Sequence, residues 1–367
     1  MRIDEIKKYQ LSANQLMFII IQVCVGTGIL SLPRAISKTS RQDSWLAIII
    51  GALMWVTALF FMDKLASLFP KDTIIEYSPK ILGKFLGSII AISYSVYSTI
   101  TAAIIARLFI TVLTSYILPQ TPILVTIIIL ILTCLYSSNL GFKTMARLHQ
   151  FLFFALVPTF LLLIPASIEI DLLNLRPVFN TGIKSILKGS YDTMFSYVGI
   201  EVLLLIFPFI KQKQKVFKYS TAGIGVVTLT YLYIVMIGIG FFGSNTLQHM
   251  IWPTINILKA IRIPFFGRLE FLFIFFWIAI AFTTVQVYCH MANYSLTQLF
   301  NWEDHRLSNF ILFPILIGLA FLPNNILEVY DYINFIAQLG TILAFVIPPS
   351  MLLIAKLRGV RGDQQYD

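Results

Sequence analysis

The chain has 367 residues, of which 58% are apolar and only 12% are charged. Soluble domains carry about twice that charged fraction, and the apolar residues here form runs of roughly 20, the length that crosses a bilayer. The composition therefore excludes an ordinary soluble domain and predicts an all-α polytopic membrane protein. The net charge of +10 does not indicate nucleic acid, because the basic residues lie between the apolar runs, as the positive-inside rule explains.

Ten apolar segments are predicted to span the lipid bilayer, with short polar or Pro/Gly-containing connections between them. They cover residues 13–36, 44–69, 86–118, 122–138, 147–168, 185–210, 218–243, 266–299, 308–322 and 332–356. No soluble domain interrupts them. The sequence therefore predicts a single integral membrane domain over residues 1–367.

The loop charges predict the orientation of the chain. With the N-terminus inside, most Lys and Arg residues fall on that side, including those of "KQKQK" at 211–215, so both termini are expected in the cytoplasm. Segments 1 and 6 then run in opposite directions, as an inverted repeat of five helices requires. The repeats would cover roughly 13–168 and 185–356. This prediction rests on the topology and on the interruption expected in each half, because the two halves show no convincing residue-by-residue similarity.

Segment 1 contains "VCVGTGILSLPR" at 23–34, with Gly26 and Gly28 on either side of Thr27. A glycine costs about 1 kcal/mol against alanine inside a helix, so local unwinding is one hypothesis. The freed N–H groups would favour a carboxylate, and the freed carbonyls a cation or an amine. The alternative is a small-residue face that packs against another helix. Arg34, at the outer end, is expected to anchor the helix at the membrane interface.

Segment 3 places two candidate side chains on one helical face. Tyr97 and Thr101 are four residues apart and could line a cavity. Arg107 lies about ten residues from the outer end of the same segment. It could pair with a carboxylate such as Glu201, line an aqueous vestibule, or snorkel outward along the helix.

Segment 6 contains "FSYVGIE" at 195–201, which places Gly199 and Glu201 near its middle. Ionisable residues inside membrane segments are rare and are functional candidates by default. Glu201 could neutralise a substrate amine, carry a proton, or pair with a structural cation. The alternative is a hydrogen-bonded packing residue.

Segment 8 contains "AFTTVQVYCHMANYS" at 281–295, with Thr283 and Thr284 in mid-span. Sodium takes oxygen ligands as other hard cations do. These hydroxyls, with Val25 beside the expected break in segment 1, form a possible ion site. The alternative is hydrogen bonding between helices. The segment also carries a polar stripe, expected to face protein or water, made of Gln286, His290 and Asn293.

No motif in the sequence indicates an enzyme or a bound cofactor. A phosphate loop, a nucleotide domain and a G-x-S-x-G turn are missing from the sequence. The cysteines show neither a disulfide framework nor metal-ligand spacing, because all of them lie within or beside apolar runs: Cys24, Cys134 and Cys289.

Several motifs resemble a known family. "GTGIL" in segment 1 and "FSYVGIE" in segment 6 resemble stretches of the amino acid–polyamine–organocation superfamily. The length, the ten spans, "GTGILSLPR", "IIEYSPKILGKFLG", "GFKTMARLHQF" and "FLPNNILEVYDYINFI" together resemble the B subunit of GerA-type spore germinant receptors. The similarity extends over essentially the whole chain.

The resemblance implies a five-plus-five inverted-repeat fold of the LeuT type, with broken helices 1 and 6. It also implies nutrient sensing, often of amino acids, at the inner spore membrane, together with an A subunit and a lipoprotein C subunit. The ligand would lie between segments 1 and 6, against segments 3 and 8. The motifs place Gly26, Thr27, Gly28, Tyr197, Gly199 and Glu201 at this site. The geometric argument adds Tyr97, Thr101, Thr283 and Thr284.

Three readings of the function stay open at this point. The first is a receptor subunit that binds a small nutrient and signals to its partners. The second is an amino acid transporter coupled to protons or sodium, and the third is a scaffold with a vestigial pocket. Some proton-coupled superfamily members carry a lysine in segment 5, which "FLFFALVPTFLLLIPASI" lacks, so that mode of coupling is in doubt.

Overall fold

Apolar helices dominate the computed structural model, which describes residues 9–262 and 267–362 apart from the side chain of Thr27. Within these residues, six helical stretches are long and apolar enough to cross a membrane, or seven if one bent pair counts as a span. The six stretches are Gly28–Leu68, Lys84–Tyr116, Gly141–Ile168, Lys213–Phe242, Leu269–Leu299 and Ile326–Leu357. The prediction of an all-α polytopic membrane protein is confirmed.

The helices follow one another with short connections. The longer ones are α2 (Ala13–Ser40), α3 (Ser44–Leu68), α4 (Ile74–Leu82), α5 (Lys84–Tyr116), α6 (Ile123–Ser138), α7 (Gly141–Leu152), α10 (Ile183–Asp192), α12 (Val216–Phe242), α14 (Pro253–Ala260), α15 (Leu269–Leu299), α16 (His305–Ala320), α17 (Ile326–Phe345) and α18 (Ile347–Leu357). Short α-helical pieces are α8 (Leu156–Leu161), α9 (Ile164–Ile168), α11 (Leu203–Ile206) and α13 (Ser244–Leu247). The 3₁₀ turns are η1 (Arg41–Asp43), η2 (Phe153–Ala155), η3 (Leu172–Leu175), η4 (Met194–Tyr197), η5 (Ile200–Val202), η6 (Phe207–Phe209) and η7 (Lys213–Lys215).

Most predicted segments coincide with helices to within a few residues, and the larger differences have local causes. The fifth segment begins earlier than expected, at Gly141. The last segment begins at Ile326, because the Asn325 side chain accepts hydrogen bonds from the N–H groups of Leu327 and Glu328, both at 3.0 Å. The short helix α4 was not predicted as an element; a capping box between Thr73 and Glu76 begins it.

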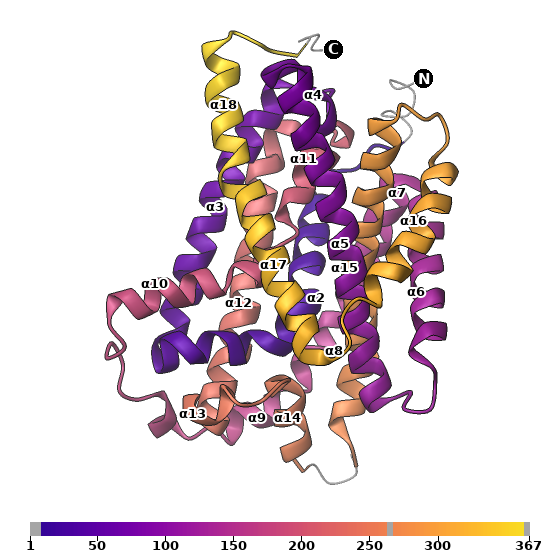
Figure 1. Ribbon diagram of the computed structural model, residues 1–367. Coiled ribbons are helices and arrows are strands. Elements are labelled where there is room, and N and C mark those ends of the chain that lie inside the picture. Colours follow the sequence, from indigo (N-terminus) through magenta and orange to yellow (C-terminus); the bar gives the residue numbers. More distant parts are fainter. Residues whose placement is uncertain (1–8, 263–266, 363–367) are drawn as a thin grey trace.

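The central helices are α2, α5, α12 and α15, with α2 packed between α12 and α15 (Figure 1). α2 changes direction along its length, so its C-terminal part lies across the bundle beside α10. The start of α2 and the end of α18 lie at the same end of the molecule, and α13 and α14 lie at the other. At the first end, the N–H of Gly362 donates to the Leu68 carbonyl at 2.9 Å.

The unwinding expected at Gly26 and Gly28 is not observed, and that prediction is wrong. α2 is α-helical through both glycines. A Cβ at Gly26 would lie 1.8 Å from Oγ1 of Thr284, and one at Gly28 would lie 2.4 Å from the hydroxyl of Tyr231. The glycines therefore admit side chains from α15 and α12 against the backbone, which is the small-residue packing alternative.

The interruption expected in segment 6 is confirmed. α10 ends at Asp192, and the chain continues through η4 and η5 to α11. The two parts of this segment are bent by 42°. Gly199 lies at the interruption with φ +120°, in a region of backbone space that side chains with a Cβ rarely adopt.

Replacing Gly28 with alanine should destabilise the protein by roughly 1–3 kcal/mol, because an overpacked methyl group must displace the Tyr231 ring. The thermal midpoint of the detergent-solubilised protein measures this loss. Gly225→Ala in α12 is the matched control, since a Cβ there meets nothing within 4 Å. Equal midpoints for Gly28→Ala and Gly225→Ala would contradict the packing role of Gly28.

Candidate functional site

Glu201 is the centre of the candidate site. It lies on η5, is fully buried, and accepts hydrogen bonds from three donors. Its Oε1 accepts from the hydroxyls of Tyr97 at 2.7 Å and Tyr288 at 3.0 Å, and its Oε2 accepts from the Gly199 N–H at 2.8 Å. The carboxylate thus joins α5, α15 and the interrupted segment 6.

The backbone at Gly199 positions the Glu201 carboxylate. With φ at +120°, the Gly199 N–H points to the side chain two residues further on. A Cβ at this position would also lie 2.6 Å from both γ-methyl groups of Val23 on α2. Glycine is therefore required at position 199 for two reasons: the backbone conformation of the turn and the close approach of α2.

The Glu201 carboxylate has no cationic partner in the part of the chain that the structure describes. Among the described residues, no Lys, Arg or His forms an ion pair with it. Besides these three donors, the backbone N–H of Glu201 itself contacts the carboxylate, so donors surround the group without neutralising its charge. An isolated negative charge at this depth is costly, so the site is suited to a proton or to the ammonium group of a ligand.

Tyr97 and Thr101 lie on the same face of α5, as predicted. The Tyr97 ring meets the Tyr288 ring edge-on, with centroids 6.1 Å apart. A Cβ at Gly340 on α17 would lie 2.7 Å from the Tyr97 hydroxyl, so α17 closes this side of the site. Thr101 is fully buried, and its Oγ1 has no hydrogen-bond partner.

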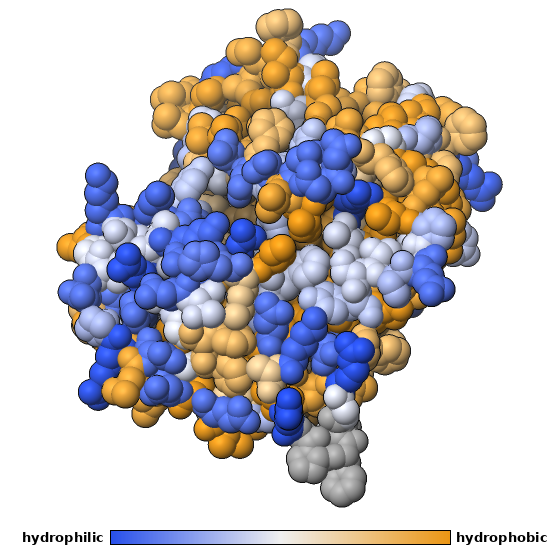
Figure 2. Space-filling model, turned by 60° about the horizontal axis from the view of Figure 1, so that its bottom comes forward, coloured by the Kyte–Doolittle hydropathy of each residue, from blue (hydrophilic) through white to orange (hydrophobic). Residues whose placement is uncertain are grey.

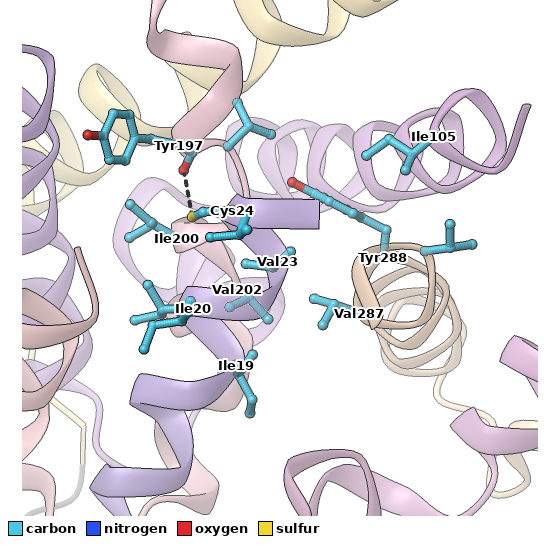
Figure 3. Packing of buried hydrophobic residues seen from close by; sticks show 14 of the residues in the cluster. Ile19, Ile20, Val23, Cys24, Ile105, Tyr197, Ile200, Val202, Val287 and Tyr288 are labelled. Carbon is cyan, nitrogen blue, oxygen red and sulfur yellow. Dashed lines mark hydrogen bonds between the residues drawn. The ribbon is translucent and has the colours of Figure 1, made fainter. Parts of the chain in front are cut away.

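The side chain of Tyr197 points away from Glu201. Its hydroxyl lies 3.0 Å from Oγ1 of Thr228 on α12. Its carbonyl faces α2 and accepts a hydrogen bond from the Cys24 thiol at 3.5 Å. Figure 3 shows Cys24 between the Tyr197 carbonyl on one side and Tyr288 on the other, with the Tyr197 ring turned outward. Tyr197 thus contributes its backbone, and not its ring, to this region.

Side chains from α12 and α15 donate hydrogen bonds to α2 carbonyls near Gly26 and Gly28. The Tyr231 hydroxyl lies 2.5 Å from the Cys24 carbonyl and 2.6 Å from the Ser196 carbonyl, while Nε1 of Trp277 donates to the Gly26 carbonyl at 2.6 Å. These backbone oxygens were expected to face a ligand. The structure gives them protein donors instead, and the Thr27 side chain lies outside the described part.

Of the two hydroxyls predicted for the possible ion site, only that of Thr284 contacts carbonyls of α2. Thr284 donates toward the carbonyls of Gln22 at 3.3 Å and Val23 at 3.4 Å, so it gathers oxygen atoms from α2. Thr283 instead donates to the Ile280 carbonyl of its own helix at 2.6 Å. Val25 is fully buried. No group of three or more His, Cys, Asp or Glu side chains suited to a metal occurs among the described residues.

The polar stripe of segment 8 faces protein, one of the two surroundings predicted for it. Gln286, His290 and Asn293 are all buried. Gln286 lies 3.1 Å from Nε2 of His149, and the Asn293 amide donates to the His305 carbonyl at 2.9 Å. These contacts join α15 to α7 and α16, away from Glu201.

Arg107 does not pair with Glu201. Its guanidinium lies over the Phe321 ring, 5.4 Å from the centroid, at the end of α16. Of the hypotheses for this side chain, pairing with Glu201 is therefore wrong.

The sequence reasoning missed three aromatic residues that contact α2 or Glu201, namely Tyr231, Trp277 and Tyr288. For two of them, the spacing in the sequence indicates the correct helical face. Trp277 and Tyr288 lie seven residues before and four residues after Thr284, so they share its helical face. The Tyr231 hydroxyl gave no comparable signal, because its partners are backbone carbonyls of other segments.

Comparison with known proteins identifies relatives over nearly the whole chain. The family model described as spore germination protein matches residues 10–329. Spore germination protein YndE of Bacillus subtilis (strain 168) is 28% identical over 97% of this chain and 98% of its own. Spore germination protein A2 of the same strain is 25% identical over 95% of this chain and 96% of its own.

Two solved structures share the fold. MhsT in complex with L-phenylalanine matches with a TM-score of 0.67 and 12% identity, over 96% of this chain and 99% of that one. Mhp1, a nucleobase-cation-symport-1 family transporter, matches with a TM-score of 0.68 and 15% identity, over 96% of this chain and 80% of that one. Identities this low establish the fold alone.

The resemblance inferred from the sequence motifs is thus confirmed over nearly the whole chain. The protein is a multi-pass integral membrane protein, and its relatives are receptor subunits with a permease-like fold rather than enzymes. The chain belongs to the spore germination protein family, as a B-subunit type of germinant receptor built on the LeuT-like transporter fold.

Proposed function

We propose that this chain is the subunit of a germinant receptor that binds a small nutrient in mid-membrane and signals its presence to partner subunits in the spore inner membrane. The observation that carries the proposal is the buried Glu201, which has three donors and no cation among the described residues. A ligand ammonium would supply the missing positive charge. The nutrient is therefore an amine, and we infer an amino acid.

The surroundings of Glu201 support a small ligand. Thr101 provides a fully buried hydroxyl without a partner, one helical turn from Tyr97. The interruption of segment 6 beside Gly199 supplies a backbone that is not bound into a regular helix. The related fold of MhsT was solved in complex with L-phenylalanine, an amino acid.

An inverted-repeat topology would fit this proposal. We infer ten crossings by adding to the six long stretches the bent pair Ile183–Asp192 and Met194–Phe209 and the shorter apolar helices Ala13–Gly26, Ile123–Ser138 and His305–Ala320. We infer repeats of roughly 13–168 and 185–356 within one membrane domain, with both termini cytoplasmic. Segment 1 in this arrangement is bent but helical, and segment 6 is interrupted.

Signalling requires the ligand to prefer one conformation, because a ligand with equal affinity for two states shifts neither. Glu201 meets this requirement, since it joins α5, α15 and segment 6 through its hydrogen bonds. An ammonium that competes for the carboxylate would weaken its bonds to Tyr97 and Tyr288. We infer that A- and C-type receptor subunits detect the resulting displacement of these helices.

A second candidate function is secondary transport of an amino acid. Its support is the transporter fold together with Thr284, whose hydroxyl gathers the Gln22 and Val23 carbonyls. Sodium bound with Thr284, Thr283 and Val25, or a proton on Glu201, would then couple to the ligand.

Replacing Glu201 with glutamine should raise the nutrient concentration for half-maximal germination at least tenfold, since a lost charge-assisted contact costs about 1.5–3 kcal/mol. Release of dipicolinic acid from spores that carry this receptor alone measures the response. Glu169→Gln, at an exposed position, is the control. An unchanged response in Glu201→Gln spores with normal protein levels would exclude an ammonium site at Glu201.

Counterflow of labelled amino acid in proteoliposomes separates the receptor from the transporter. For a receptor that does not transport, we expect no counterflow with an amino acid that triggers germination and binds the purified protein. Counterflow that Thr284→Val abolishes would instead establish transport, because that variant loses the hydroxyl between the α2 carbonyls.

Cysteine labelling tests the orientation of the chain. The three native cysteines are buried, so an introduced thiol at an exposed position should dominate the labelling. With cytoplasmic termini, Gln212→Cys should react with an impermeant maleimide only after the cells are opened, and Lys259→Cys should react in intact cells. The reverse pattern would place both termini outside.

A further inference from the structure

A cavity lies where the end of α2 and η1 meet the loop before α10 and the helix α10 itself. Its volume is about 520 Å³, within the range of sites for small molecules. Its lining includes three cations, Lys38 on α2, Arg41 on η1 and Lys188 on α10, and no carboxylate among the described residues. The other lining residues include hydroxyl and amide side chains such as those of Gln42 and Ser185. We call this space the basic cavity.

Hydrogen bonds hold the walls of the basic cavity together. The Asp43 carboxylate, buried at the end of η1, accepts from the N–H of Phe179 at 2.7 Å and from the N–H and Oγ1 of Thr181 at 3.0 and 2.7 Å. Oγ of Ser40, at the end of α2, donates to the Ser185 carbonyl at 3.3 Å. These bonds join the loop and the start of α10 to the end of segment 1, so the cavity has a defined shape.

Neighbouring carboxylates do not neutralise the basic cavity. Among the described residues, no ion pair involves Lys38, Arg41 or Lys188. Asp192 lies within electrostatic reach of Lys38 and Lys188, but its Oδ2 accepts a hydrogen bond from Thr39 at 2.8 Å and pairs with neither cation. With cytoplasmic termini, the end of α2 lies on the side where the positive-inside rule expects few basic residues. Topology therefore does not account for these cations, whereas an anionic ligand does.

An exposed apolar row continues from the basic cavity along α10. Ile183, Leu187 and Tyr191 are 78%, 53% and 48% exposed, and their spacing of four residues places them on one face of the helix. Lys188, which lines the cavity, directly follows Leu187 in the chain. α10 thus presents apolar surface and cationic surface side by side.

The basic cavity lies at the level of the membrane interface. α3 begins at Ser44, directly after η1, and its 25 residues extend about 37 Å, somewhat more than the roughly 30 Å of the hydrocarbon core. The first turn of α3 and the cavity beside it therefore reach the headgroup region. Figure 2 shows hydrophilic side chains gathered on the left of the molecule, the side where α10 lies in Figure 1, next to hydrophobic ones.

We propose that the basic cavity binds the headgroup phosphate of an anionic phospholipid, whose acyl chains lie against the apolar row of α10. The Arg41 guanidinium offers two parallel donors to phosphate oxygens, and Lys38 and Lys188 add charge. A soluble phosphate compound would use the cavity alone and leave the apolar row uncovered, so the row favours a lipid.

A bound headgroup would connect two segments that surround the candidate site. Lys38 and Arg41 lie at the end of segment 1, whereas Lys188 lies in segment 6 before its interruption. A ligand held by both favours the arrangement in which both are within its reach. The lipid site is distinct from Glu201, because none of the described donors to that carboxylate lines the basic cavity.

Dihexanoyl-phosphatidylglycerol is the probe, because it combines the anionic headgroup with short acyl chains and dissolves in water. We expect it to raise the thermal midpoint of the full chain in a nonionic detergent saturably, since a ligand that binds the folded state stabilises it. Dihexanoyl-phosphatidylcholine, with the same chains and no net charge, should leave the midpoint unchanged. Glycerophosphoglycerol, the same headgroup without chains, should act only at concentrations at least tenfold higher.

Substitutions separate the cavity from the general surface charge. Arg41→Gln and Lys188→Gln should each weaken binding of the phosphatidylglycerol about fivefold, the effect of one basic residue near anionic lipid. Leu187→Ser should weaken it severalfold without changing the response to glycerophosphoglycerol. Lys184→Gln is the matched control, since Lys184 is exposed on the same helix but does not line the cavity. The measurements contain no nutrient, so their outcome does not depend on the proposed function of Glu201.

Four outcomes would overturn the proposal. The first is a missing or unsaturable shift with the phosphatidylglycerol, and the second is an equal shift with the phosphatidylcholine. The third is glycerophosphoglycerol binding as tightly as the lipid, which would indicate a soluble phosphate compound. The fourth is the same lipid affinity in correctly folded Arg41→Gln and Lys188→Gln as in the unmodified chain, or a loss in Lys184→Gln equal to that in Lys188→Gln.

Discussion

The hydrogen bonds to the Glu201 carboxylate determine how the centre of this protein is arranged. Two phenols from α5 and α15 and one backbone N–H converge on a fully buried side chain. The donors lie on three different elements. Their hydrogen bonds to one carboxylate therefore fix how close α5, α15 and segment 6 lie to one another. Among the described residues no cation pairs with Glu201, which makes this arrangement suited to binding, because the donors solvate the carboxylate without neutralising it.

Glycines bring the backbones of this region close together. Gly199 allows the turn that aims its N–H at the carboxylate, and the absence of a Cβ lets Val23 approach. Gly26 and Gly28 allow Thr284 and Tyr231 to reach the α2 backbone. Glycines look like helix breakers in both segments, but Gly26 and Gly28 act as contact surfaces within the helix of segment 1, whereas Gly199 lies at a true interruption of segment 6.

The sequence predicted the parts of this fold that depend on local composition. Runs of apolar residues located the helices, and the paired features at Gly199 and Glu201 located the interruption in segment 6. Spacing alone did not separate unwinding from close packing at Gly26, because that depends on which side chain another helix presents. The role of Tyr231 was equally hidden, since it bonds to backbone oxygens far away in the chain.

The position of the Tyr231 hydroxyl has a consequence for how segments 1 and 6 move. It lies between the Cys24 carbonyl of α2 and the Ser196 carbonyl of segment 6, at 2.5 and 2.6 Å, yet it has one proton to donate. Either carbonyl alone satisfies that proton, so the Tyr231 hydroxyl keeps a partner if the segments separate. Separation would therefore cost the Tyr231 contact to one carbonyl but not the other, and α12 would stay attached to the segment that keeps the bond.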